Sequence, residues 1–249
     1  MAKIYRTPAG YVVEDDDVYR ALEGDLFGQW HAGAEVAAPA TVLAPVVPSK
    51  IVCIGLNYKD HAAEQGKPLP AEPLIFLKPS SAVINPGDAI ELPDGVGRVD
   101  YESELAVVIG RRATKVSEDE ALSHVLGLTC MNDVTARDLQ KKDGRYTRAK
   151  GFDTFAPLGP CIATGLTADD LAVTGLVNGE VRQQSSTREL IFPVATLIAY
   201  ISRIMTLLPG DVVSTGTPAG IGPLQAGDEI VVRVQGIGDL RNSVRRSHP

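Results

Sequence analysis

Cysteine is scarce in this chain of 249 residues, which contains only Cys53, Cys130 and Cys161. Their number is odd, their spacings are wide and no CxxC pair occurs, so we expect no disulfide framework. Each cysteine sits among apolar neighbours, which favours buried free thiols. This pattern is typical of a protein in a reducing cytoplasm.

Long apolar runs and an excess of basic residues are also absent. No apolar run approaches the roughly 18 residues that a membrane-spanning helix needs, and the N-terminus lacks the basic and apolar stretches of a signal peptide. The formal net charge is −7, whereas a phosphate-binding surface must be basic. We therefore expect a cytoplasmic protein without a nucleic-acid or membrane partner.

Residues 1–47 differ in composition from the rest of the chain. Residues 11–13 suit a short strand, residues 14–17 are an acidic run, and residues 37–48 are rich in alanine, proline and valine. A lone acidic run without other ligand types is typical of a solvated turn rather than a metal site. We predict a small N-terminal domain at 1–47 and a main domain at 48–249.

Strand signals dominate the main domain. Apolar runs predict strands at 51–55, 74–77 and 105–109. A Gly-Asp turn that leads at once into a strand pattern occurs at 86–90, 209–213 and 226–230. Helical signals are fewer, with a capping box at Ser117 and Glu120 and apolar residues at helical spacing over 193–207. These features predict an α+β, β-rich fold built as a sandwich or barrel.

Acidic residues precede the apolar run at 105–109, and they carry the strongest local signal. On a strand, Glu102 and Glu104 point to the same side, with Asp100 behind them. Like charges side by side repel, and a hard divalent cation would remove that repulsion. An exposed edge strand with a polar face explains the same spacing.

A second polar segment contains Asp133, which follows an apolar run at 125–130 and is able to supply a third carboxylate. If a helix starts next, Arg137 and Gln140 share one face of it, and a cation beside an amide suits a substrate carboxylate. A capped helix without any site is the alternative.

A third segment contains His61 and Glu64, which are three residues apart and meet on one helical turn. A carboxylate that orients an imidazole raises its basicity, as a general base requires. The glycine and prolines at 66–70 suit a mobile lid. A simple surface pair is the alternative.

Two further segments carry weaker signals. Lys150 precedes a rigid stretch and is able to hold a developing oxyanion, although a surface lysine is the alternative. Residues 214–222 lack the Lys-Ser/Thr pair of a phosphate loop, so we expect no nucleotide, but the Thr217 hydroxyl suits a carboxylate. The basic residues at 141–149 fit either an anionic substrate or a solvated surface.

Taken together, these segments resemble the fumarylacetoacetate hydrolase family. The matching residues are Gly55-Leu56-Asn57-Tyr58 with His61 and Glu64, Asp100-Tyr101-Glu102-Ser103-Glu104, Asn132-Asp133 with Ala136-Arg137-Asp138, Lys150 with Phe152-Asp153, and Gly216-Thr217-Pro218-Ala219-Gly220. Any one match is weak, whereas five in the family's order are specific. Gly151 departs from the pattern, because the family leads us to expect serine there. The short N-terminal piece resembles small bacterial and archaeal members.

The resemblance implies a mixed β-sandwich roll with a small N-terminal β appendage, usually as a homodimer, in which residues 48–249 are the catalytic domain. It implies Mg²⁺ or Mn²⁺, with Ca²⁺ as an alternative, on Glu102, Glu104 and Asp133. It also implies that His61 and Glu64 activate water. The residues expected to contact substrate are Lys150, Arg137, Gln140 and Thr217.

The implied reaction is metal-dependent C–C bond cleavage of a small anionic 2-oxo acid. We expect acylpyruvate-type hydrolysis, which gives pyruvate and a carboxylic acid through a metal-held enolate. The alternatives are oxaloacetate decarboxylation, the isomerisation or decarboxylation of 2-hydroxyhepta-2,4-diene-1,7-dioate in aromatic catabolism, and dehydration of a sugar acid. A non-catalytic metal- or ligand-binding homologue also stays open, although binding alone needs no base such as His61.

Overall fold

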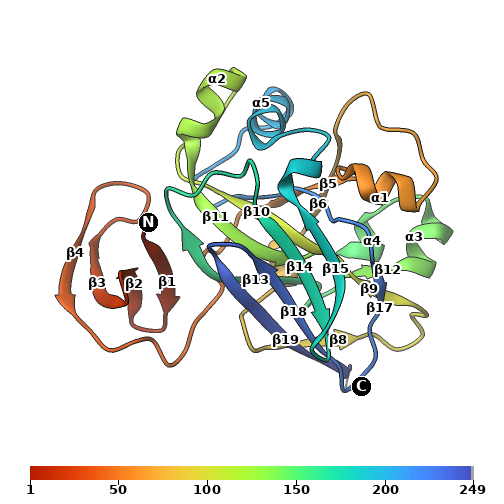
Figure 1. Cartoon of the computed structure of the whole chain (residues 1–249), viewed down its shortest axis with the longest axis horizontal. Coiled ribbons are helices and arrows are strands. Elements are labelled where there is room, and N and C mark those ends of the chain that lie inside the picture. Colours follow the sequence, from red (N-terminus) through yellow and green to blue (C-terminus); the bar gives the residue numbers. More distant parts are fainter. Residues whose placement is uncertain (248–249) are drawn as a thin grey trace.

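The computed structural model describes residues 1–247, and most of its regular structure is strand (Figure 1). The strands of the largest sheet are β1 (Lys3–Thr7), β2 (Gly10–Asp15), β3 (Val18–Gly24), β4 (Trp30–Glu35), β5 (Ile51–Gly55), β6 (Leu74–Lys78), β7 (Val83–Ile84), β10 (Ser103–Ile109), β11 (Val125–Asn132), β13 (Ala156–Ala163) and β16 (Val212–Ser214). Their order is β4-β3-β2-β1-β13-β11-β10-β16-β5-β6, with β7 paired to β13.

Two smaller sheets complete the strand architecture. The 5-stranded sheet, in the order β15-β14-β18-β19-β8, contains β8 (Ala89–Leu92), β14 (Ala172–Val177), β15 (Glu180–Ser186), β18 (Glu229–Val234) and β19 (Gly238–Arg246). The 3-stranded sheet, in the order β12-β9-β17, contains β9 (Val99–Tyr101), β12 (Thr135–Ala136) and β17 (Gly222–Pro223).

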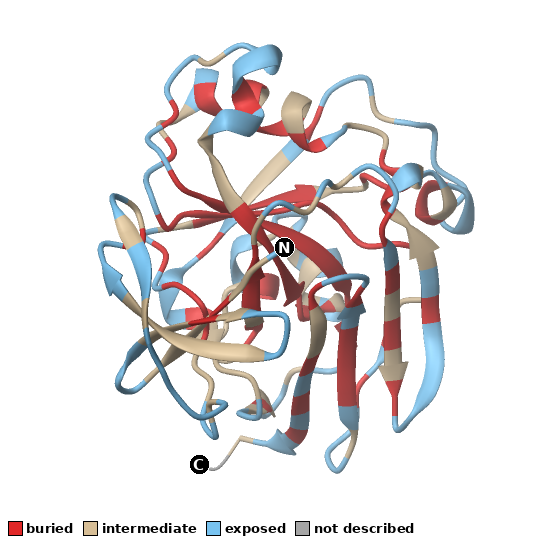
Figure 2. Cartoon of the chain, turned by 60° about the vertical axis from the view of Figure 1, so that its left-hand side comes forward, coloured by how far each residue is buried: buried red, intermediate tan, exposed pale blue. Residues whose placement is uncertain are grey.

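The sandwich forms where the 5-stranded sheet packs on the largest sheet. Val232 and Leu240 from the smaller sheet share one core cluster with Leu105 and Val107 of β10. Parallel pairs such as β16 with β5 occur beside antiparallel pairs, so the strand arrangement is mixed. Strands in the middle of the largest sheet are buried along most of their length (Figure 2). The predicted β-rich α+β sandwich fold is thus confirmed.

Helices are short and lie around the sheets. They are α1 (Lys59–Glu64), α2 (Glu118–Ala121), α3 (Arg137–Asp143), α4 (Thr147–Lys150) and α5 (Val194–Ile204), with 3-10 turns at Ser80–Ala82, Leu122–His124 and Thr187–Glu189. The capping box of Ser117 and Glu120 is present, and α5 buries its apolar face, as predicted. Within residues 1–247, no helix has the length and apolar character needed to cross a membrane.

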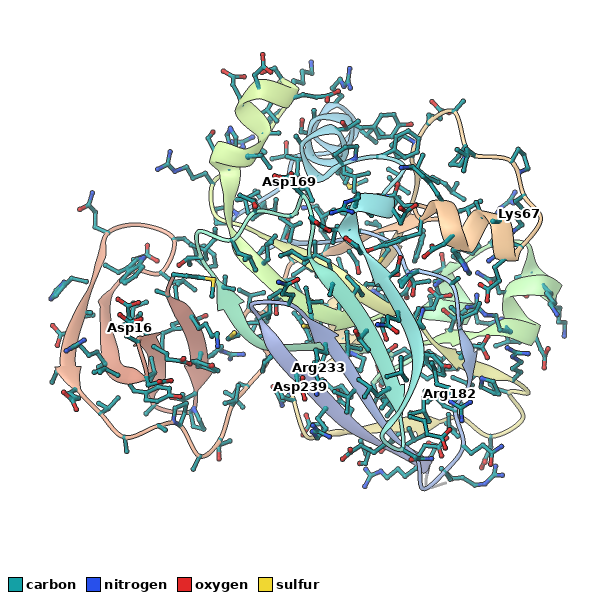
Figure 3. The ribbon with its side chains drawn as sticks, viewed as in Figure 1. Asp16, Lys67, Asp169, Arg182, Arg233 and Asp239 are labelled. Atoms are coloured by element: carbon teal, nitrogen blue, oxygen red, sulfur yellow. The ribbon has the colours of Figure 1, made fainter. Side chains whose placement is uncertain are left out.

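The N-terminal strands extend the largest sheet. β1 pairs with β13, so that Lys3 lies opposite Ala163. Ile4 and Val13 belong to the same core cluster as Ile51 of the main domain. The acidic run at 14–17 covers the end of β2 and the turn before β3, so only its second half is the predicted turn. Asp16 in that turn lies at the opposite end of the molecule from Lys67 in the view of Figure 3. The division at residues 47 and 48 stays a prediction, and the shared core does not favour it.

The three cysteines are buried and free, as the sequence predicted. Burial raises the pKa of each thiol, and that of Cys161 reaches about 12. A thiol that keeps its proton is a poor nucleophile. The cysteines therefore act as small apolar side chains in the core.

Candidate functional site

Two acidic side chains enter one cavity where β9 passes into β10. β9 ends at Tyr101, and Glu102 occupies the joint before β10. Along β10, Glu104, Ala106 and Val108 share a face because alternate residues point the same way. Ala106 and Val108 pack in the core, whereas Glu104 lines the cavity at the end of this face. The alternation of the sequence therefore produces the expected pairing of the two glutamates.

The third acidic side chain, Asp133, follows β11, which pairs antiparallel with β10. The Asp133 amide donates to the Glu102 carbonyl at 2.9 Å, and the Glu102 amide donates to Asn132 Oδ1 at 3.0 Å. These two bonds fix the ends of neighbouring strands against each other. One carboxylate oxygen from each of Glu102, Glu104 and Asp133 lies within 4.8 Å of the other two, and all three residues are buried.

Two buried lysines donate to this acidic triad. Lys150 Nζ donates to Glu102 at 2.8 Å, to Asp133 at 2.5 Å and to the Thr135 hydroxyl at 2.7 Å. Lys78 Nζ donates to Asp133 at 2.7 Å. Burial disfavours the charged form of Lys150, but the Asp133 and Glu102 carboxylates outweigh it and hold the pKa of Lys150 above its usual value. Lys150 therefore carries a positive charge beside the triad.

Arg137 adds a third cation at the first position of α3. Its guanidinium donates to Glu102, to Asp100 at 2.8 Å and to Gln140 Oε1 at 2.9 Å. Burial would raise the pKa of Glu102, but the nearby Lys150 and Arg137 charges hold it well below the usual range. Glu102 is therefore a carboxylate at neutral pH. Arg137 and Gln140 share one helix face, as the sequence spacing predicted.

Glu104 has a different environment from the other two acids. It accepts hydrogen bonds from the Ser214 hydroxyl at 2.5 Å and the Gly216 amide at 2.9 Å. No ion pair reaches it from any side chain between residues 1 and 247. Burial, and then the neighbouring Asp133 and Glu102 charges, raise the pKa of Glu104 well above its usual value. A divalent cation would remove that repulsion, and buried oxygen-only ligands suit a hard ion, so the triad fits one.

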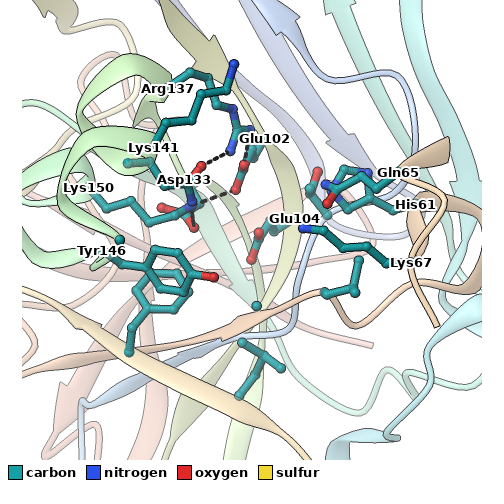
Figure 4. A pocket seen from close by; sticks show the side chains of 17 residues that line it. His61, Gln65, Lys67, Glu102, Glu104, Asp133, Arg137, Lys141, Tyr146 and Lys150 are labelled. Atoms are coloured by element: carbon teal, nitrogen blue, oxygen red, sulfur yellow. Dashed lines mark hydrogen bonds and ion pairs between the residues drawn. The ribbon is translucent and has the colours of Figure 1, made fainter. Parts of the chain in front are cut away.

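His61 faces the triad from α1, on the far side of the cavity (Figure 4). Its Nδ1 lies 2.7 Å from Glu64 Oε2, and the other Glu64 oxygen accepts the Gly220 amide at 2.9 Å. A carboxylate accepts, so the imidazole proton lies on Nδ1 and Nε2 is left as an acceptor. Gln65 Nε2 lies 2.6 Å from that Nε2 and donates to it. Gln65 therefore occupies the atom at which His61 would accept a proton.

The cavity between these groups has a volume of about 310 Å³. It is lined by eight of the nine predicted site residues, namely His61, Glu102, Glu104, Asp133, Arg137, Gln140, Lys150 and Thr217. The ninth, Glu64, contacts His61 from outside this lining. Lys67 from the predicted lid at 66–70, and Lys141 and Tyr146 from the basic segment at 141–149, also line it. Gln65 and Phe76 are cavity residues that the sequence did not single out. The sequence also did not predict a role for Lys78, which donates to Asp133. The only sequence signal at Lys78 was its position at the end of a predicted strand.

Two expected substrate contacts are already engaged within the protein. The Thr217 hydroxyl donates to the Ser103 carbonyl at 3.1 Å and accepts from Gln183 Nε2 at 2.8 Å. Arg137 uses donors on all three guanidinium nitrogens for internal partners. Donation from the Thr217 hydroxyl to a substrate thus requires its bond to Ser103 to be exchanged, whereas each terminal nitrogen of Arg137 keeps one further N–H donor. Both roles stay predictions.

Gly151, which departs from the family pattern, follows α4 and Lys150. A Cβ added at Gly151 would lie 2.5 Å from the Thr147 carbonyl oxygen, which is closer than side chains tolerate. The α4 turn that presents Lys150 to the triad therefore leaves no space for a serine in this backbone conformation.

The chain is similar to known proteins over most of its length. The model of the fumarylacetoacetate (FAA) hydrolase C-terminal family matches residues 50–245. An uncharacterized protein of Archaeoglobus fulgidus is 55% identical over 212 residues, which are 85% of each chain. The mitochondrial oxaloacetate tautomerase fahd2 of Xenopus laevis is 43% identical over 217 residues, which are 82% of this chain and 68% of that protein. The crystal structure of 5-carboxymethyl-2-hydroxymuconate delta-isomerase from Mycobacterium smegmatis superposes with a TM-score of 0.89 at 42% identity, covering 99% of this chain and 100% of that one.

Proposed function

The chain belongs to the fumarylacetoacetate hydrolase family, as a small prokaryotic-type member, and we propose that it is a divalent-metal-dependent enzyme acting on a small 2-oxo acid. One observation carries this proposal. The buried triad and the His61–Glu64 pair face each other across a single cavity of about 310 Å³. A binding protein would need the triad but not the oriented base. We also propose a homodimer, as family membership implies.

The charges around the triad favour an anionic substrate. Four acidic side chains, Asp100, Glu102, Glu104 and Asp133, lie among four basic ones, Lys78, Arg98, Arg137 and Lys150. The signs balance when all eight are ionised, so a divalent ion leaves this cluster positive. The ion would supply Lewis acidity that favours the enolate form of the substrate. A 2-oxo acid brings one negative charge as its carboxylate and gains a second as an enolate, which matches this excess.

For the reaction, we propose C–C bond hydrolysis of an acylpyruvate with His61 as the general base. Glu64 holds the imidazole with its proton on Nδ1, so Nε2 is free to take a proton from water once Gln65 releases it. Lys150 is the proposed donor to the developing oxyanion. Because its three protons already point to Glu102, Asp133 and Thr135, that role requires it to exchange one of these partners.

A second candidate is tautomerisation, isomerisation or decarboxylation of a 2-oxo diacid. The similarity to an oxaloacetate tautomerase and to a muconate delta-isomerase favours it. Such reactions share the enolate but need no attacking water. His61 would then move a proton on carbon instead of activating water, and the same cavity would serve.

Parallel turnover assays distinguish these reactions. Acetylpyruvate and oxaloacetate are each offered to the protein after EDTA treatment and again with added Mg²⁺ or Mn²⁺, while pyruvate release and enol–keto conversion are both followed. Metal-restored cleavage of acetylpyruvate is the expected result. Conversion of oxaloacetate alone would select the second candidate. No metal-restored turnover of either compound would contradict the proposal of an enzyme for 2-oxo acids.

A further inference from the structure

Two of the basic side chains that line the cavity, Lys67 and Lys141, have no partners of their own. Neither amino group makes a hydrogen bond or an ion pair with any other residue in the described range of 1–247. By contrast, Lys150 donates to Glu102, Asp133 and Thr135. Arg137 also donates to other residues of the protein. Lys67 and Lys141 therefore have all three of their donors available for an anion.

The two lysines lie on different sides of the cavity. Lys67 follows α1 on the same segment as His61, and its side chain extends toward Glu104 (Figure 4). Gly66, with a φ of +61°, turns the chain there in a conformation that favours glycine. Lys141 stands on α3 beside Arg137, across the cavity from His61 (Figure 4).

The position of the proposed base decides which lysine meets the far end of a substrate. If the carboxylate and 2-oxo group lie at the triad, the remainder of the molecule must pass His61, because the base acts beyond the 2-oxo carbon. Lys67 lies on that side, whereas Lys141 does not. A lysine with three free donors is a suitable partner for a carboxylate.

We propose that Lys67 binds a second carboxylate at the distal end of the substrate and thereby selects 2-oxo dicarboxylic acids over monoacids of the same length. This inference rests on the proposed function, but it does not depend on which reaction follows. It applies equally to a diacid that is tautomerised and to an acylpyruvate whose acyl group ends in a carboxylate.

Two ligands of equal length test the proposal directly. 2-Oxoadipate and 2-oxohexanoate have the same carbon chain and differ in the distal carboxylate alone. Their dissociation constants are measured by calorimetry with the Mg²⁺-loaded full-length protein. We expect the native protein to prefer 2-oxoadipate by about tenfold, since a hydrogen bond to a charged group contributes about that factor. Lys67→Gln should remove this preference by weakening 2-oxoadipate alone, and Lys67→Arg should retain most of it.

Lys141→Gln is the matched control, because it removes the same charge from the opposite side of the same cavity. It should leave the ratio of the two dissociation constants within about twofold, a difference that corresponds to under half a kcal/mol. Equal binding of both ligands by the native protein, or an unchanged preference in Lys67→Gln, would overturn the assignment of Lys67 while leaving the 2-oxo acid site in place. Binding of neither ligand would overturn the proposed function and, with it, this inference.

Discussion

Glu102 and Glu104 are two residues apart, yet their surroundings move their pKa values in opposite directions. Lys150 and Arg137 offset the burial of Glu102 and hold its pKa low, whereas burial and the neighbouring acids raise that of Glu104. Glu102 is thus balanced within the protein, while Glu104 is the acid whose charge lacks compensation. A divalent ion would supply that compensation, which is the residue-level reason to regard the triad as a metal site.

At the same scale, the proposed base gives a prediction. His61→Ala should lower acylpyruvate hydrolysis by about 10²–10⁴-fold, because a positioned general base contributes that much. Oxaloacetate decarboxylation should fall much less, since it needs no activated water. Steady-state kinetics on both substrates measure the difference. An equal loss of both activities would show that the role of the His61–Glu64 pair is misassigned.

Local spacing predicted most of the residues around the cavity, but not those that depend on distant contacts. His61 and Glu64 are neighbours on one helical turn, and that contact follows from a separation of three residues. Lys78 reads as an ordinary lysine at the end of a strand, and only the arrival of Asp133 from 55 residues away makes it a buried ion-pair partner. Thr217 was predicted to contact the substrate, and its spacing gave no sign that Gln183, 34 residues away, bonds its hydroxyl.

At the scale of elements, the three Gly-Asp turns share one geometry. Asp88, Asp211 and Asp228 each accept the backbone amide three residues earlier, at 2.9, 2.7 and 2.7 Å respectively. Only Asp211 is fully buried, and it also binds Ser49 and Lys50 before β5. Asp211 therefore connects, through these hydrogen bonds, the turn before β16 with the residues before β5, and β5 is the parallel neighbour of β16. β16 ends at Ser214, whose hydroxyl donates a hydrogen bond to Glu104. The turn therefore helps to fix the position of Glu104 in the triad.

Asp211→Ala should reduce the free energy of unfolding by about 3–5 kcal/mol, because it leaves Lys50 without the partner of a partly buried ion pair. Asp88→Ala is the matched control, since Asp88 has the same turn geometry but is exposed. It should cost about 1 kcal/mol, the contribution of an ordinary hydrogen bond. Denaturant unfolding of both variants measures these values. Similar costs at the two positions would contradict the structural role given to Asp211.

At the scale of the whole molecule, the N-terminal strands are part of the largest sheet. Residues 1–47 differ in composition from the rest of the chain, and this difference led to the prediction of a separate domain. Composition does not indicate that β1 pairs with β13, which lies about 160 residues away in the sequence. The order β13-β11-β10-β16-β5-β6 was beyond prediction for the same reason, because pairing between distant strands leaves no local pattern. The strands themselves and the sandwich class were predictable from alternation and turns.

Removal of residues 1–47 should therefore destabilise the remaining chain. It would expose one edge of β13 and remove Ile4, Val13 and Leu26 from the core cluster, at about 1.5–3 kcal/mol for each buried side chain. A loss of that size should lower the melting temperature by about 10 °C or more. Calorimetry of the fragment 48–249 beside the full chain measures it. An unchanged melting temperature would instead establish 1–47 as a separate domain.

The central claim is that the buried triad holds the metal on which turnover depends. Its most direct test is the turnover of acetylpyruvate and oxaloacetate by the native protein and by Glu102→Ala, each stripped with EDTA and then titrated with Mg²⁺ or Mn²⁺. Glu180→Gln, which neutralises an exposed acid, serves as the control. We predict metal-restored turnover in the native protein and the control, and none in Glu102→Ala. A Glu102→Ala variant that remains active and metal-stimulated would contradict the account.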